Sequence, residues 1–254
     1  MSRVAVIALN TFRESLRDRI LYNLLFFALL LIGFSALLGD FTIAEQKKIV
    51  TDLGLAAINL VGVIIAIFVG IGLVSKEIER RTVYTIMARP ISRAQFILGK
   101  YLGLALTLLV NVGIMLAVFL ATLLMDGVPI HWGLFQAVEL IYVELLLVTA
   151  LALFFSTFSS STVSAIMTLG FYVIGHLTAD LKGIAAKSAS ETVKAAMTGL
   201  YYLCPNLEAL NVKGQAAMGT SVALSYQVLA SAYGLAYAAV LITAACAVFN
   251  RRDF

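Results

Sequence analysis

The chain has few charged residues. Only 13% of its 254 residues are Asp, Glu, Lys or Arg, whereas 61% are hydrophobic, and its mean hydropathy is +0.99. In soluble globular domains about a quarter of the residues are charged. The composition therefore excludes an ordinary soluble domain and indicates an integral membrane protein of the all-α class.

The usual motifs of catalysis are missing. The sequence contains no G-x-x-x-x-G-K-[ST] phosphate-binding loop, no G-x-S-x-G nucleophile elbow and no H-E-x-x-H zinc motif. Ser161 and His176 stand at opposite ends of one predicted helix, about 20 Å apart at 1.5 Å per residue, which is too far for a Ser-His pair. We therefore expect neither enzyme activity nor a cofactor in this chain.

Cysteine and histidine are also scarce, with two of each. Cys246 falls inside a predicted span and Cys204 in an outer segment, so we expect no disulfide between them. His131, His176 and Cys204 do not have the spacing of metal ligands, and the seven methionines form no cluster. We expect no metal site.

What the chain has instead is a series of long uncharged runs. Four runs of 19 to 25 residues can each cross about 30 Å of hydrocarbon as a helix, namely 20–38, 53–74, 101–125 and 228–249. Two less regular runs are 132–155, which contains Glu139 and Glu144, and 163–179, which contains His176. We predict six transmembrane helices, with a large outer segment at 180–227 that packs against the outer mouth of the bundle.

Residues 3–19 predict an interfacial elbow helix that leads into the first span. One helical face is polar (Asn10, Arg13, Glu14 and Arg17), and another is apolar (Ala5, Leu9, Phe12 and Leu16). The short apolar core and the lack of a small-residue cleavage site are not typical of a signal peptide.

The Lys and Arg residues predict the orientation. With the N-terminus in the cytoplasm, the inner segments hold twelve of the eighteen Lys and Arg, and six of these lie in residues 76–100. We predict that both termini are inside. The net charge of +4 is then an effect of orientation and of contact with lipid headgroups, and we predict no nucleic-acid binding.

The polar block KEIERRTVYTIMARPISRAQFILGK, residues 76–100, divides into two parts. Arg89-Pro90 disfavours helix, and Ser92 with Gln95 forms an S-x-x-Q capping box that starts a new helix at about Arg93. The first part presents apolar positions beside a charged rim, which favours a docking surface. A solvated loop whose charges only fix topology is the alternative. The candidate docking residues are Glu77, Glu79, Arg80, Arg81, Thr82, Val83, Ile86, Met87, Pro90, Ser92 and Arg93.

The same block resembles a family signature. The run from Glu77 through Arg81-Thr82, Ala88-Arg89-Pro90, Ser92-Arg93 and Gly99-Lys100 is similar to the "E…RRT…L.A.P.SR…GK" pattern of ABC-2 type transporter permeases, and the order of elements is similar along the whole chain. PNLEALN, residues 205–211, suggests the group that contains the permease of nitrous oxide reductase maturation.

The resemblance implies a membrane subunit in the inner membrane of a prokaryote. It implies a permease homodimer driven by a separate ABC ATP-binding subunit, in two copies, which would bind ATP and Mg, with residues 76–100 containing the coupling helix. We expect export of an unidentified substrate. A mechanotransmitter that passes motion to a periplasmic partner is the alternative, and an autonomous channel or scaffold is a third reading.

Polar groups inside the predicted spans are the candidate pathway residues: Glu144, Glu139, Asn59, Asn111 and His176. Burying an ionisable group in a membrane is costly, so Glu144 either lines a pathway or binds a cation, or it is protonated or hydrogen-bonded between helices. Glu139 lies about 140° around the helix from Glu144, so the two do not form a carboxylate pair. We expect interhelical hydrogen bonds from Asn59 and Asn111, and an interfacial position for His176.

Overall fold

The computed structural model describes residues 3–40, 46–79, 92–178, 180, 181, 183 and 190–250, and for residues 36–40, 46 and 73–79 it describes the backbone alone. In these residues the chain is helical, without a strand. The elements are α1 (Arg3–Ser15), α2 (Arg19–Asp40), α3 (Gln46–Glu79), α5 (Arg93–Met125), α6 (Trp132–Ser156), α7 (Ser161–His176), α9 (Glu191–Leu203), η1 (Glu208–Leu210), α10 (Lys213–Ala217) and α11 (Leu224–Asn250).

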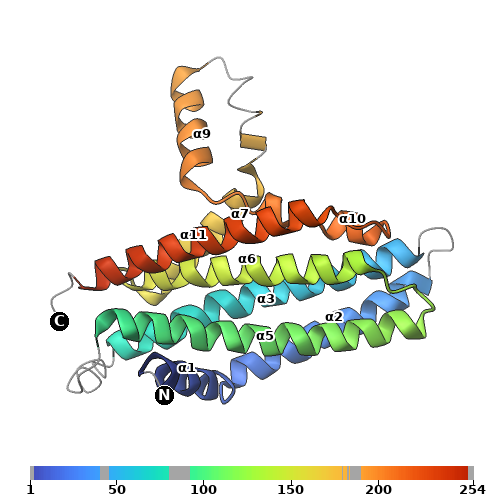
Figure 1. Cartoon of the computed structure of the whole chain (residues 1–254), viewed down its shortest axis with the longest axis horizontal. Helices are drawn as coiled ribbons and strands as arrows, with labels where there is room; N and C mark the ends of the chain where they lie inside the picture. The colour runs from blue at the N-terminus through green and yellow to red at the C-terminus, as the bar shows by residue number, and fades with distance from the viewer. Residues whose placement is uncertain are drawn as a thin grey trace.

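Long helices lie side by side in an elongated bundle, from which α9 stands away (Figure 1). By length and composition, the described helices α3, α5, α6 and α11 can each cross a membrane, and α1 with α2 can form a fifth span that is bent by 65°. Helices are thus confirmed at all six predicted positions. The six-span topology stays a prediction, because α7 has 16 residues whereas a crossing needs about 20.

The centre of the bundle is α6. In the most apolar stretch of α6, 83% of the residues are buried, whereas the corresponding share in α11 is 28%. A helix that is hydrophobic on all sides is stable only when other helices surround it, and α6 packs against α3, α5, α7 and α11. Several polar side chains of α6, among them Gln136, Glu144 and Thr149, are therefore buried inside the bundle.

The N-terminal helix α1 packs on the first turns of α5 through small residues. Its buried side chains are Ala8, Thr11 and Ser15, which belong to neither of the two faces named above, and Asn10, Arg13, Glu14 and Arg17 are exposed. The interfacial position of this helix stays a prediction. A Cβ built on Gly103 of α5 would lie 2.6 Å from the carbonyl oxygen of Ala8, so only glycine lets the two backbones approach this closely. Buried Lys100 of α5 lies 3.5 Å from the Glu14 carboxylate and fastens the same contact.

The predicted outer segment has two different parts in its described residues 190–227. Cys204, Leu207, Leu210 and Ala216 are buried, which agrees with the predicted packing of this segment on the bundle. Burial raises the pKa of the Cys204 thiol, which favours its unreactive protonated form. In contrast, α9 has no buried residue.

Candidate functional sites at the bundle centre and at the α5–α11 corner

Four polar side chains meet inside the bundle in what we call the Glu144 cluster: Asn59 of α3, Glu144 of α6, and Tyr172 and His176 of α7. Asn59 Nδ2 donates to Glu144 Oε2 at 2.9 Å, and the Tyr172 hydroxyl donates to Asn59 Oδ1 at 3.0 Å. Glu144 is fully buried and the His176 side chain is 21% exposed. The interhelical bond predicted for Asn59 is confirmed, and His176 lies in the cluster; its position relative to the membrane interface stays a prediction.

The contact between Glu144 and His176 constrains where a proton is held. His176 Nδ1 lies 3.2 Å from the Tyr172 carbonyl oxygen, and a carbonyl can only accept a hydrogen bond. In the neutral imidazole Nε2 is then an acceptor, yet it faces Glu144 Oε1 at 3.4 Å. The contact becomes attractive when either Nε2 or Oε1 carries an additional proton. The Glu144 cluster is thus suited to hold a proton at the centre of the bundle.

Two of the predicted pathway residues lie outside this cluster. Glu139 accepts hydrogen bonds from Gln227 Nε2 at 3.2 Å and from Ser231 Oγ at 2.8 Å, so it ties α6 to α11 and is not paired with Glu144, as predicted. Asn111 donates to the carbonyl oxygen of Thr107 in its own helix, so the predicted interhelical bond is wrong for Asn111. One turn of helix separates these two residues, and that local acceptor takes Nδ2, whereas the buried Oδ1 has no partner in the described residues.

Sequence reasoning missed Tyr172. Its ring lies 4.7 Å from that of His176, one helical turn along α7. The spacing of four residues was available in the sequence, because positions i and i+4 share a helix face. Tyrosine is common enough in membrane helices that this spacing alone did not single it out.

A second set of contacts forms where α5 begins and α11 ends, here called the α5–α11 corner. The predicted capping box is confirmed: Gln95 N donates to Ser92 Oγ at 3.2 Å, and Ser92 N donates to Gln95 Oε1 at 3.2 Å. Arg93 donates to the carbonyl oxygens of Phe249 at 3.1 Å and of Asn250 at 3.0 Å. These carbonyl groups end α11, where a cation is favoured by the helix dipole.

The remaining docking candidates lie at the edge of the structure or beyond it. Glu77 and Glu79 belong to the last turn of α3, for which only the backbone is described. Arg80, Arg81, Thr82, Val83, Ile86, Met87 and Pro90 lie outside the described residues. In the part of the chain that is described, no group of three or more His, Cys, Asp or Glu residues could hold a metal ion.

The apolar helices and the buried polar cluster define a helical membrane protein. A family model described as ABC-2 family transporter protein matches residues 5–254, and the chain belongs to this family. ABC-2 permeases are membrane subunits distinct from the ATPase, and they generally pair with an ATP-binding subunit. The match is to the family as a whole, so the nearer group suggested by PNLEALN stays a prediction. Comparison with curated proteins gave no match.

Proposed function

We propose that the chain is the transmembrane subunit of an ABC exporter in a prokaryotic inner membrane, with both termini in the cytoplasm. It acts as a homodimer with two copies of a separate subunit that binds ATP and Mg. Closure of the ATP-binding subunits moves the docking surface in residues 76–100, and this motion switches the bundle between inward-facing and outward-facing states. Family membership supports the pairing with an ATP-binding subunit.

The observation that carries the proposed coupling is the α5–α11 corner. Its 33 residues make α5 about 50 Å long, which exceeds the hydrocarbon thickness of about 30 Å, so its first turns extend beyond the bilayer. Arg93 ties these turns to the end of α11, and α1 packs on them as well. A push on the segment before Ser92 therefore moves three helices together.

Charge reversal in the docking surface tests this coupling. We expect Arg81→Glu to abolish co-purification of the ATP-binding subunit and ATP-dependent transport, while the protein still inserts in the membrane. Arg93→Glu is expected to uncouple as well, although it also breaks the contact with α11. Lys194→Glu in α9 is the matched control, because it reverses a charge far from the docking surface along the chain. Unchanged association and transport in Arg81→Glu would overturn the assignment of this surface.

A specific observation also supports the mechanotransmitter as a second candidate. Helix α9 stands away from the bundle and buries none of its side chains (Figure 1), as expected of an element that contacts a partner. In this case the ATP-driven motion passes to a periplasmic protein without solute transport. Proteoliposomes of the complex distinguish the two candidates: ATP-dependent movement of a solute supports export, and stable capture of a periplasmic protein without transport supports transmission. An autonomous channel would co-purify with no ATPase.

A further inference from the structure

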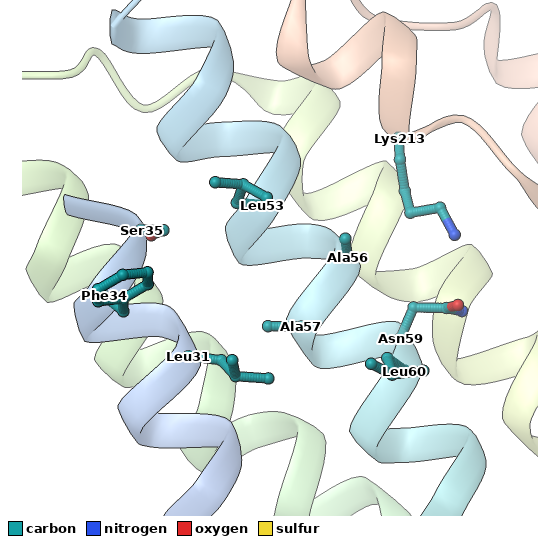
Figure 2. Close-up of a pocket in the computed structure, with 9 residues that line it drawn as sticks. All are labelled: Leu31, Phe34, Ser35, Leu53, Ala56, Ala57, Asn59, Leu60 and Lys213. Atoms are coloured by element: carbon teal, nitrogen blue, oxygen red, sulfur yellow. The ribbon is translucent and has the colours of Figure 1, made fainter. Parts of the chain in front are cut away.

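A groove between α2 and α3 is lined in part by Asn59, a member of the Glu144 cluster (Figure 2). Its volume is about 440 Å³, which falls within the range of about 300–1,000 Å³ typical of small-molecule sites. The walls are apolar side chains of the two helices. The polar lining residues are Asn59, Lys213 and Ser35. The lining residues that define the walls are Leu31, Phe34, Leu53, Ala56, Ala57 and Leu60.

The outer wall of this groove is open to the surroundings of the bundle. Phe34 is 53% exposed and Leu60 is 52% exposed, and they stand on the two helices that flank the opening. Ser35 adds no free polar group, because its hydroxyl donates to the carbonyl oxygen of Ile32 in its own helix. A molecule that enters here meets apolar side chains along most of its length.

A single cation stands at the groove. Lys213 begins α10, and Figure 2 shows its side chain extending toward Asn59. In the part of the chain that the structure describes, Lys213 forms no ion pair, and the Glu208 carboxylate of the same segment accepts from the Asn211 amide instead. An ammonium group beside apolar walls is more stable with an anion next to it.

The inner wall keeps the Glu144 carboxylate away from an anion in the groove. Both polar atoms of the Asn59 amide are engaged, with Nδ2 bonded to Glu144 and Oδ1 bonded to Tyr172. The amide therefore stands between the groove and the carboxylate. Lys213 is the cation at the groove, and its positive charge also acts through space on Glu144, although no ion pair joins them in the described residues.

We propose that this groove binds an anionic phospholipid from the bilayer, with an acyl chain between α2 and α3 and the phosphate beside Lys213. The apolar walls match the chain, and the ammonium group matches the head group. If the bound lipid is also the substrate that the bundle exports, the inference rests on the proposed function. The binding site itself does not depend on the proposed function, because lipid binding requires neither ATP nor the partner subunit.

Native mass spectrometry of the purified full chain tests the proposal. The protein is mixed with equal amounts of phosphatidylglycerol and phosphatidylcholine that carry the same acyl chains. We expect phosphatidylglycerol to be retained about five-fold more than phosphatidylcholine, which is the preference that one lysine beside an anionic head group provides. Lys213→Gln should abolish this preference, Lys213→Arg should keep it, and Lys194→Gln in α9 should leave it unchanged.

A second variant tests the apolar part of the groove. Ala56 is exposed in the groove wall, so Ala56→Phe should fill the space without a clash in the core and reduce binding of both lipids. Gly113→Phe is the control, because a Cβ at Gly113 meets nothing within 4 Å. Equal retention of both lipids by the wild type, or the same lipid preference in Lys213→Gln and Lys194→Gln, would overturn the proposal. If the wild-type protein prefers phosphatidylglycerol but associates with no ATP-binding subunit, the result would count against the proposed function alone.

Discussion

The α5–α11 corner and the Glu144 cluster use polar side chains in opposite ways. At the corner, Ser92 and Arg93 bind backbone groups at helix ends, which any helix leaves unsatisfied. In the cluster, Glu144 and Asn59 bind each other across helices whose backbone groups are already satisfied. The corner thus joins helix ends through their backbone groups, whereas the cluster joins α3, α6 and α7 through side chains buried between them.

The largest expected effect comes from separating α1 from α5. In Gly103→Leu the new side chain would overlap Thr11 and the Ala8 carbonyl group, both of which lie 2.6 Å from the Cβ position. Overpacking a core by a few atoms already costs about 1–3 kcal/mol, so we expect a loss of more than about 3 kcal/mol. Thermal unfolding in detergent measures it. Gly113→Leu, on the same helix with open space at Cβ, should unfold like the wild type, and equal loss in both variants would contradict the role of this contact.

The Glu144 cluster is expected to be the next most sensitive. Glu144→Ala leaves the buried Asn59 Nδ2 without its acceptor and removes the group that can share a proton with His176 Nε2. We expect a cost of about 3 kcal/mol, the upper end of the range for unsatisfied buried groups. Glu144→Gln should cost much less, because its amide oxygen accepts from Asn59 and its amide nitrogen donates to Nε2. Thermal unfolding of the two variants side by side checks this order. If both variants were equally unstable, a packing role would replace the polar one.

A smaller effect is expected from the tie between α5 and α11. Arg93→Ala removes the donors to the Phe249 and Asn250 carbonyl groups, and we expect a cost of about 1.5 kcal/mol, the lower end for bonds to a charged group, since the guanidinium group is partly exposed. Amide hydrogen exchange in the last turn of α11 should become faster. Arg93→Lys keeps the charge and should show an intermediate rate. Unchanged exchange in Arg93→Ala would show that this end of α11 is held by other contacts.

The smallest effect concerns the cap itself. Ser92→Ala removes the acceptor for Gln95 N and should cost about 1 kcal/mol, the typical loss for an N-cap serine. The change should appear as faster amide exchange confined to the first turn of α5. Ser92→Asp retains an acceptor and favours the helix dipole, so it should exchange as slowly as the wild type. Faster exchange along all of α5 would mean that the cap also supports the tie to α11.

Local interactions explain which of these features could be predicted. The cap at Ser92 joins residues three apart, and its chemistry is written in those residues alone. The Asn59–Glu144 bond joins residues 85 apart, and the Arg93–Phe249 bond joins residues 156 apart. The cost of burying Glu144 singled it out as a candidate, but its partners could not be deduced from the sequence. For the same reason, the docking role of Arg93 was proposed without its contact to α11.

The amino-acid sequence by itself determined the all-helical membrane class, the positions of the six helices, the polar face of α1 and the start of α5. Each of these depends on hydrophobic length or on interactions within about one helical turn. Only the tertiary structure decided that α1 packs on α5 through small residues, that His176 lies beside Glu144, and that Lys213 stands at the α2–α3 groove. The physical reason is that a membrane helix satisfies its own backbone groups and presents mostly apolar side chains. Its sequence therefore carries no local signal for how the helix is rotated about its axis or which helices lie next to it, and packing decides both.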